Sequence, residues 1–177
     1  MQVRHKGYVH IYCGDGKGKT TAAVGLTVRC VGYGERVLFV QFLKGWDSGE
    51  LHVLEKHPEV TLVRGDSSDK FVFQMDDVEK RTAQAQYDDN LRYIASEMKN
   101  GYHLLVLDEV MAAWNCGLID RTLLIDLLEH RPDTVEVVMT GRNPPEELMA
   151  FADYISEVRK VRHPYDKGVQ ARRTIEF

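Results

Sequence analysis

Short apolar runs and amphipathic stretches alternate along the whole chain. The apolar runs are rich in Val, Ile, Leu and Tyr and are bounded by turn residues; they predict strands at residues 8–12, 37–42, 60–63, 103–107, 134–139 and 154–158. Strands that alternate with helical patterns are typical of an α/β fold in which helices cover both faces of the sheet. We therefore predict one domain over residues 1–177, built on a mostly parallel six-stranded sheet.

Apolar residues recur at helical spacing between the predicted strands. Helices are expected at residues 20–31, 49–56, 77–99 and 121–130, and Pro144, Pro145 and the two glutamates after them mark the start of another. The longest helix carries one apolar stripe, which we expect to pack in the core rather than bind a ligand: Ala83, Tyr87, Leu91, Ile94 and Met98.

Two segments fall outside this alternation. Residues 65–75 form a polar loop that carries Phe71 and Phe73, and residues 159–177 form a basic tail after the last strand. Loops at the carboxyl ends of parallel strands build the sites of such sheets, so we expect the tail, from residue 160 on, to lie near the active site.

A glycine-rich turn between the first strand and the first helix carries the strongest chemical signal. Residues 13–21 read C-G-D-G-K-G-K-T-T, which is a P-loop shortened by one residue, because Cys13 stands where the full pattern has its first glycine. Backbone N–H groups and a helix N-terminus there suit a polyphosphate, and they predict these ATP-binding residues: Gly14, Asp15, Gly16, Lys17, Gly18, Lys19, Thr20 and Thr21. The fold class is accordingly that of P-loop NTPases, RecA-like. A dinucleotide fold is disfavoured because the strand at 37–42 does not end in an acidic residue.

A second motif at the same sheet edge suggests a metal. The strand at 103–107 runs into Asp108 and Glu109, the form of a Walker B element, and we expect Mg²⁺ to be held by Thr20, Asp108 and Glu109. Acidic residues after a strand also serve as helix caps, which is the structural alternative. Arg142 follows another strand and either binds a phosphate or forms a surface ion pair.

Composition excludes several other classes. A formal net charge of −4 argues against a broad nucleic-acid surface, and no apolar stretch is long enough for a membrane span. The short polar N-terminus has no signal-peptide core, so we expect a cytoplasmic protein. The three cysteines are isolated, which argues against a disulfide framework or a zinc site.

The motifs, taken in order, resemble the bacterial P-loop ATP:corrinoid adenosyltransferase family, the cob(I)alamin adenosyltransferases. The shortened loop at 14–23 is similar to the family's G-[ND]-G-K-G-K-T-T-A-A, and the likeness continues through Q-F-L-K-G at 41–45, L-D-E at 107–109, T-G-R at 140–142, H-P-Y-D at 163–166 and the closing I-E-F. The resemblance implies a homodimeric enzyme that moves the 5′-deoxyadenosyl group of ATP to the Co(I) centre of a corrinoid, with Mg²⁺ bound and triphosphate released. It also implies a flavoprotein reductant.

The resemblance assigns further residues. The family binds ATP in the reverse of the usual orientation, which would place Arg29, in the first helix, near the nucleoside; ordinary solvent exposure is the alternative for that side chain. Phe71 and Phe73 resemble the aromatic residues that displace the lower axial ligand of the corrinoid, although the family usually has Trp at the second position. Packing of the two side chains on the sheet edge is the structural alternative. His163 and Tyr165 are the other corrinoid-binding candidates, and the catalytic candidates are Lys19, Phe71 and Phe73.

Two other functions remain open from the sequence. One is a P-loop ATPase or kinase that releases ADP, since Walker elements serve many reactions. The other is a carrier that binds ATP and corrinoid with weakened catalysis. Two departures from the family pattern favour keeping it: Phe73, and Thr174 where the family commonly has Gly.

Overall fold

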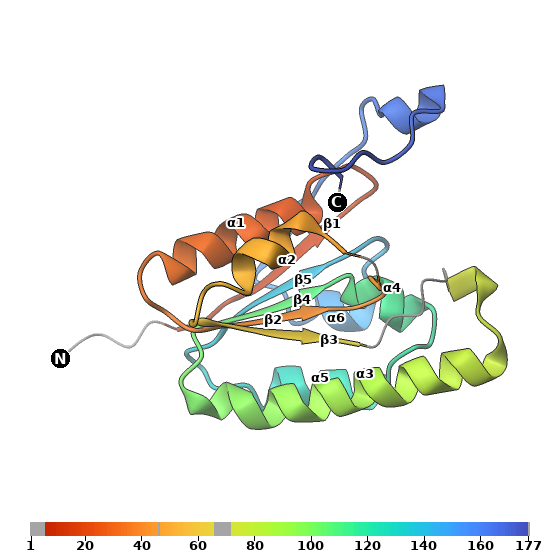
Figure 1. The fold of residues 1–177 in the computed structure, drawn as a ribbon. Helices are drawn as coiled ribbons and strands as arrows, with labels where there is room; N and C mark the ends of the chain where they lie inside the picture. The colour runs from red at the N-terminus through yellow and green to blue at the C-terminus, as the bar shows by residue number, and fades with distance from the viewer. Residues whose placement is uncertain (1–5, 46, 66–71, 177) are drawn as a thin grey trace.

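A single six-stranded sheet forms the centre of the computed structural model, which describes residues 6–45, 47–65 and 72–176 (Figure 1). The strands lie in the order β3-β2-β4-β5-β1-β6, and all five neighbouring pairs are parallel. Their bounds are β1 Val9–Cys13, β2 Val37–Gln41, β3 Val60–Arg64, β4 Leu104–Asp108, β5 Glu136–Thr140 and β6 Tyr154–Glu157. The predicted α/β fold and its six strands are confirmed.

Helices cover both faces of this sheet. On one face lie α1 (Lys19–Val31) and α2 (Gly49–Leu54), and α3 (Asp77–Glu97) and α5 (Arg121–Glu129) lie on the other (Figure 1). The short helices α4 (Val110–Asn115) and α6 (Glu146–Met149) contribute to the same core as α3 and α5. The remaining elements are three 3₁₀ turns: η1 (Val72–Gln74), η2 (Met98–Asn100) and η3 (Pro164–Lys167).

Burial in the apolar core explains why strands and helices could be predicted from the pattern of apolar residues in the sequence. β2 and β4 are buried along their whole length, because helices cover both of their faces. The predicted stripe of α3 packs as expected: Tyr87, Leu91, Ile94 and Met98 are buried, and Ala83 packs against them. Strand β6 is exposed throughout, as befits the edge of the sheet.

The structure corrects the prediction in a few places. The helix α4, directly after Glu109, was not predicted, because its six residues are too few to show a periodic pattern. The helix expected at 49–56 ends at Leu54, and the one expected at 77–99 passes into η2 at Met98. Each end differs by about the amount by which helix termini fray.

The three cysteines are free thiols, and Cys13 is a buried residue at the end of β1. None of the helices in the described ranges combines the length and apolar character that a bilayer crossing requires.

Candidate functional site

The turn from β1 to α1 has the geometry of an anion-binding loop. Gly14 (φ 102°) and Gly18 (φ 120°) adopt backbone conformations that favour glycine. Helix α1 begins at Lys19 with no side-chain cap and with no acidic residue in its first turn. The partial positive charge of this helix terminus is therefore available to a phosphate.

Lys19 is folded into the loop itself. Its side chain is buried, and Nζ donates a hydrogen bond of 2.8 Å to the carbonyl oxygen of Gly16. Burial lowers the pKa of Lys19, and the nearby carboxylate of Glu109 partly opposes that shift. A cation held this way lies close to any anion that the loop binds.

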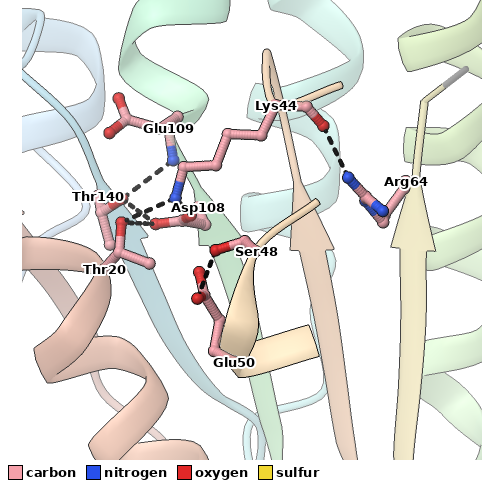
Figure 2. Close-up of polar contacts among 8 residues, drawn as sticks. All are labelled: Thr20, Lys44, Ser48, Glu50, Arg64, Asp108, Glu109 and Thr140. Atoms are coloured by element: carbon pink, nitrogen blue, oxygen red, sulfur yellow. Dashed lines mark hydrogen bonds and ion pairs between the residues drawn. The ribbon is translucent and has the colours of Figure 1, made fainter. Parts of the chain in front are cut away.

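A buried polar cluster lies beside the loop, where β4 and β5 end; we call Thr20, Lys44, Asp108 and Thr140 the Asp108 cluster. Asp108 is 0% exposed. Its Oδ1 accepts hydrogen bonds from the Thr20 hydroxyl (2.9 Å) and the Thr140 hydroxyl (2.7 Å), and its Oδ2 lies 2.9 Å from Nζ of Lys44 (Figure 2). The carboxylate is thus fully paired, as a buried charge requires.

Glu109 adopts a strained backbone conformation next to this cluster. It has φ 60°, and its N–H donates to the Thr140 hydroxyl (2.9 Å), so Thr140 orients both acidic residues. The carboxylate points away from Asp108 (Figure 2) and lines the cavity described below. Burial, and then the charge of Asp108, raise the pKa of Glu109.

The Asp108 cluster fits the chemistry of Mg²⁺. The ion prefers oxygen ligands, keeps several waters and takes other ligands from the substrate phosphates, so one or two protein oxygens suffice. The Thr20 hydroxyl and the Asp108 carboxylate supply such oxygens, and a cation, the Lys44 ammonium, already lies against them. The described residues contain no group of three or more His, Cys, Asp or Glu that could hold a metal without such a substrate.

The C-terminal tail, residues 159–176, begins packed on the phosphate loop. A Cβ added to Gly14 would lie 2.4 Å from the carbonyl oxygen of Val158, and one added to Gly16 would lie 2.8 Å from the same atom. The N–H of Gly16 donates to that oxygen (2.8 Å), and Asp15 Oδ1 accepts from the N–H of Lys160 (2.8 Å). These glycines therefore serve the contact between loop and tail as well as any contact with phosphate.

A cavity of about 470 Å³ lies between the phosphate loop, the start of α2 and the tail. Its lining combines four positively charged side chains, Lys17, Lys19, Lys44 and Arg142, with four carboxylates, Asp15, Glu50, Glu109 and Glu176. The tail contributes His163, Thr174, Ile175 and Glu176. The pKa of Glu176 is lowered, mainly by its bond with Arg172.

Thr174 occupies the position where the family pattern has glycine. Its φ is 73°, a left-handed backbone conformation that favours glycine. For a β-branched residue this conformation costs on the order of 1 kcal/mol.

The structure does not bring every predicted residue to this cavity. Phe73 lies in η1 with its side chain 83% exposed, and Phe71 lies outside the described residues. Tyr165 is 66% exposed and does not line the cavity. Arg29 lines a second cavity, of about 450 Å³, together with His103, Leu104 and Glu136, where β4 and β5 begin. The roles of these residues stay predictions.

Sequence reasoning assigned no role to Lys44, Thr140 or Glu50. Lys44 follows β2 by three residues, and β2 pairs directly with β4, with Gln41 opposite Asp108. Parallel strands end at one edge of the sheet, so a residue just after β2 lies near a residue just after β4. This could have pointed to a contact between Lys44 and Asp108, but only once the order of the strands is known.

The loop, the Walker B carboxylates and the parallel sheet define a P-loop nucleotide-binding protein. Comparisons with known proteins give the family. The family model described as ATP:corrinoid adenosyltransferase BtuR/CobO/CobP matches residues 5–177, and the chain belongs to this family.

Similar proteins that carry the name corrinoid adenosyltransferase agree with the family model. The corrinoid adenosyltransferase CobA of Salmonella typhimurium is 34% identical over 175 residues, which is 97% of this chain and 86% of that protein. The corrinoid adenosyltransferase of Escherichia coli K12 is 32% identical with the same coverage. That of Pseudomonas aeruginosa is 30% identical over 97% of this chain and 84% of its own.

Proposed function

We propose that this enzyme transfers the 5′-deoxyadenosyl group of ATP to the Co(I) centre of a corrinoid and releases triphosphate. The observation that carries the proposal is the cavity at the shortened phosphate loop, which gathers Lys17, Lys19, Lys44 and Arg142 in a chain that belongs to the adenosyltransferase family. These four cations, together with the N–H groups of the loop, would supply charged donors to a polyanion such as triphosphate, although four carboxylates line the same cavity.

In this reaction the protein needs to orient the substrates and stabilise charge, and it does not need to supply a nucleophile. The Co(I) substrate supplies the electron pair that forms the cobalt–carbon bond at C5′, and the C5′–O bond breaks with its pair leaving on triphosphate. Negative charge grows on the leaving group as that bond breaks. The loop N–H groups, Lys17, Lys19 and Arg142 would stabilise this charge, and the loop would hold C5′ in line with the metal.

Mg²⁺ belongs to the same proposal. Thr20 and Asp108 would hold the ion, with Glu109 alongside, and when bound it would neutralise charge on the triphosphate. A Walker-type pair already joined by a 2.9 Å hydrogen bond supports this assignment.

The corrinoid would occupy the side of the cavity that the tail forms. His163 lines the cavity, and Phe73, which is 83% exposed, is the aromatic residue that the family resemblance assigns to the corrinoid. We further propose, from the family resemblance, a homodimer, a flavoprotein reductant and a cytoplasmic location. Phe71 and Tyr165 keep their proposed corrinoid contacts, and Arg29 its proposed place near the nucleoside.

One assay tests the reaction. The protein is mixed with Mg-ATP and chemically reduced cobalamin, and the visible spectrum is followed for the light-sensitive adenosyl product. Analysis of the phosphate product then separates this reaction, which gives triphosphate, from an ATPase or kinase, which gives ADP. A carrier would bind both ligands and form neither product.

Lys19→Ala tests the site in the same assay. The rate should fall by at least about a hundredfold, because a buried charge at the leaving group is lost. Lys99→Ala, an exposed lysine in η2, is the matched control. Full activity in the Lys19 variant would refute the phosphate-loop assignment.

A further inference from the structure

Lys44 lies where a metal ion would meet the Asp108 cluster. Its Nζ is 2.9 Å from Oδ2 of Asp108 and 3.2 Å from Oγ1 of Thr20, the two side chains proposed to hold Mg²⁺ (Figure 2). The Lys44 side chain is itself only 19% exposed. A single ammonium group therefore contacts both proposed metal ligands.

The segment between β2 and α2 is built to aim this side chain. Leu43 has φ 58°, a conformation that costs a non-glycine residue on the order of 1 kcal/mol or more. Two side chains from neighbouring elements hold it there: the hydroxyl of Tyr87 accepts the N–H of Leu43 (2.9 Å), and Arg64 donates to the carbonyl oxygen of Lys44 (3.0 Å). Strain that persists under such restraint is typical of functional segments.

Two cations cannot share these oxygens. A Mg²⁺ ion bound to Thr20 and Asp108 would lie within a few ångströms of the ammonium group, in a buried place where like charges repel strongly. Lys44 must then leave Asp108 and find another anion. It lines the same cavity as Lys17, Lys19 and Arg142, so a triphosphate bound there would be within its reach.

We propose that Lys44 and Mg²⁺ are alternative cations for the Thr20–Asp108 pair, and that Lys44 transfers to the triphosphate when Mg-ATP binds. Lys44 is then a further triphosphate-binding residue, and it also disfavours metal binding in the absence of nucleotide. This inference rests on the proposed function for the identity of the anion, but it makes predictions that need no adenosyl transfer.

The test uses two binding measurements on Lys44→Met. Mn²⁺ alone, followed by its paramagnetic resonance signal, should bind the variant at least about tenfold more tightly than the unchanged protein, because its competitor is gone. Inorganic triphosphate, added at a Mg²⁺ concentration that saturates both proteins and followed by calorimetry, should bind the variant at least about tenfold more weakly, because one charge-assisted hydrogen bond is lost. Lys99→Met should change neither affinity.

Folding of the variants is checked by thermal unfolding. Should Lys44→Met be unfolded, Lys44→Gln replaces it, since its amide still donates to Asp108 without a full charge. If either affinity of the folded variant equals that of the unchanged protein, the proposal is wrong. A protein that shows both shifts but forms no adenosylcorrinoid would refute the proposed reaction and leave the role of Lys44 standing.

Discussion

Two walls of the cavity differ in burial and in how their side chains are paired: one is formed at the Asp108 cluster and the phosphate loop, and the other by the C-terminal tail. In the Asp108 cluster, Asp108 and Thr140 are buried and Thr20 and Lys44 are half-buried, and the carboxylate of Asp108 is paired with two hydroxyl groups and one ammonium. In the tail, every residue from 159 to 176 is exposed except His163, which is half-buried. The tail is held mainly through its first residues, at Asp15 and through the neighbouring Val158.

This difference matches the two ligands that the enzyme is proposed to bring together. Triphosphate is small and highly charged, so a preorganised wall with paired charges suits it. A corrinoid is large and must enter and leave, which suits a wall of low local stability. On the proposed function, the buried wall would hold the leaving group and the exposed tail would lie on the side of the acceptor.

The largest effect is expected from Asp108→Ala. The change leaves the Lys44 ammonium and the hydroxyl groups of Thr20 and Thr140 without their shared acceptor, so the free energy of unfolding should fall by about 3–5 kcal/mol. Denaturant unfolding measures the loss. Asp126→Ala, at an exposed site of α5, should stay within about 0.5 kcal/mol of the unchanged protein. Equal losses in the two variants would mean that the buried wall contributes no special stability.

Gly14→Ala tests the junction of the two walls. Its Cβ would lie 2.4 Å from the carbonyl oxygen of Val158, whereas the Cβ of Gly18→Ala would meet no atom within 4 Å, although both glycines have positive φ. Gly14→Ala should therefore cost about 1–3 kcal/mol of unfolding free energy beyond Gly18→Ala. Urea unfolding of the two variants isolates the contact, and identical free energies of unfolding would show that the loop does not need this close approach to Val158.

Asp15→Ala should release the tail without unfolding the sheet. The N–H of Lys160 lowers the pKa of Asp15 below its usual value, so the contact is fully present above the ordinary aspartate pKa and is lost only as the pH falls through the lowered one. Tryptic cleavage at Arg159 and Lys160 should be slow and unchanged from about pH 6 to about pH 9 in the unchanged protein. It should be faster in the variant at every pH in that range. A pH-dependent rate in the unchanged protein, once corrected for the protease, would contradict this account.

The smallest effect on stability is expected from Phe73→Ala, because that side chain is 83% exposed. The free energy of unfolding should change by less than about 0.5 kcal/mol. Adenosylation that starts from Co(II) should nevertheless slow far more than adenosylation of supplied Co(I), if Phe73 displaces the axial ligand. Tyr33→Ala, an equally exposed aromatic in the second cavity, is the control. Equal losses from both cobalt states would remove the axial-ligand role.

Much of the fold could be predicted from patterns of apolar and polar residues that are close together in the chain. The buried strands β2 and β4 and the stripe of α3 were predicted because burial imposes a periodicity on residues that are near one another in the chain. The glycine-rich turn between β1 and α1 could be recognised for the same reason, since its glycines, Lys19 and Thr20 lie within seven residues of one another, and its binding of phosphate stays a prediction. Helix α4 was missed because six residues after a strand leave no periodic trace.

The sequence by itself determined the fold class, the phosphate loop and the pair Asp108–Glu109, because each depends on neighbours within about one turn or strand. Only the tertiary structure placed Lys44 against Asp108, bound Thr140 to both carboxylate segments and set Val158 over Gly14. It also placed Arg29 in a separate cavity. These relations join residues from different strands and loops, and the order of the strands, which no local pattern encodes, decides which of them meet.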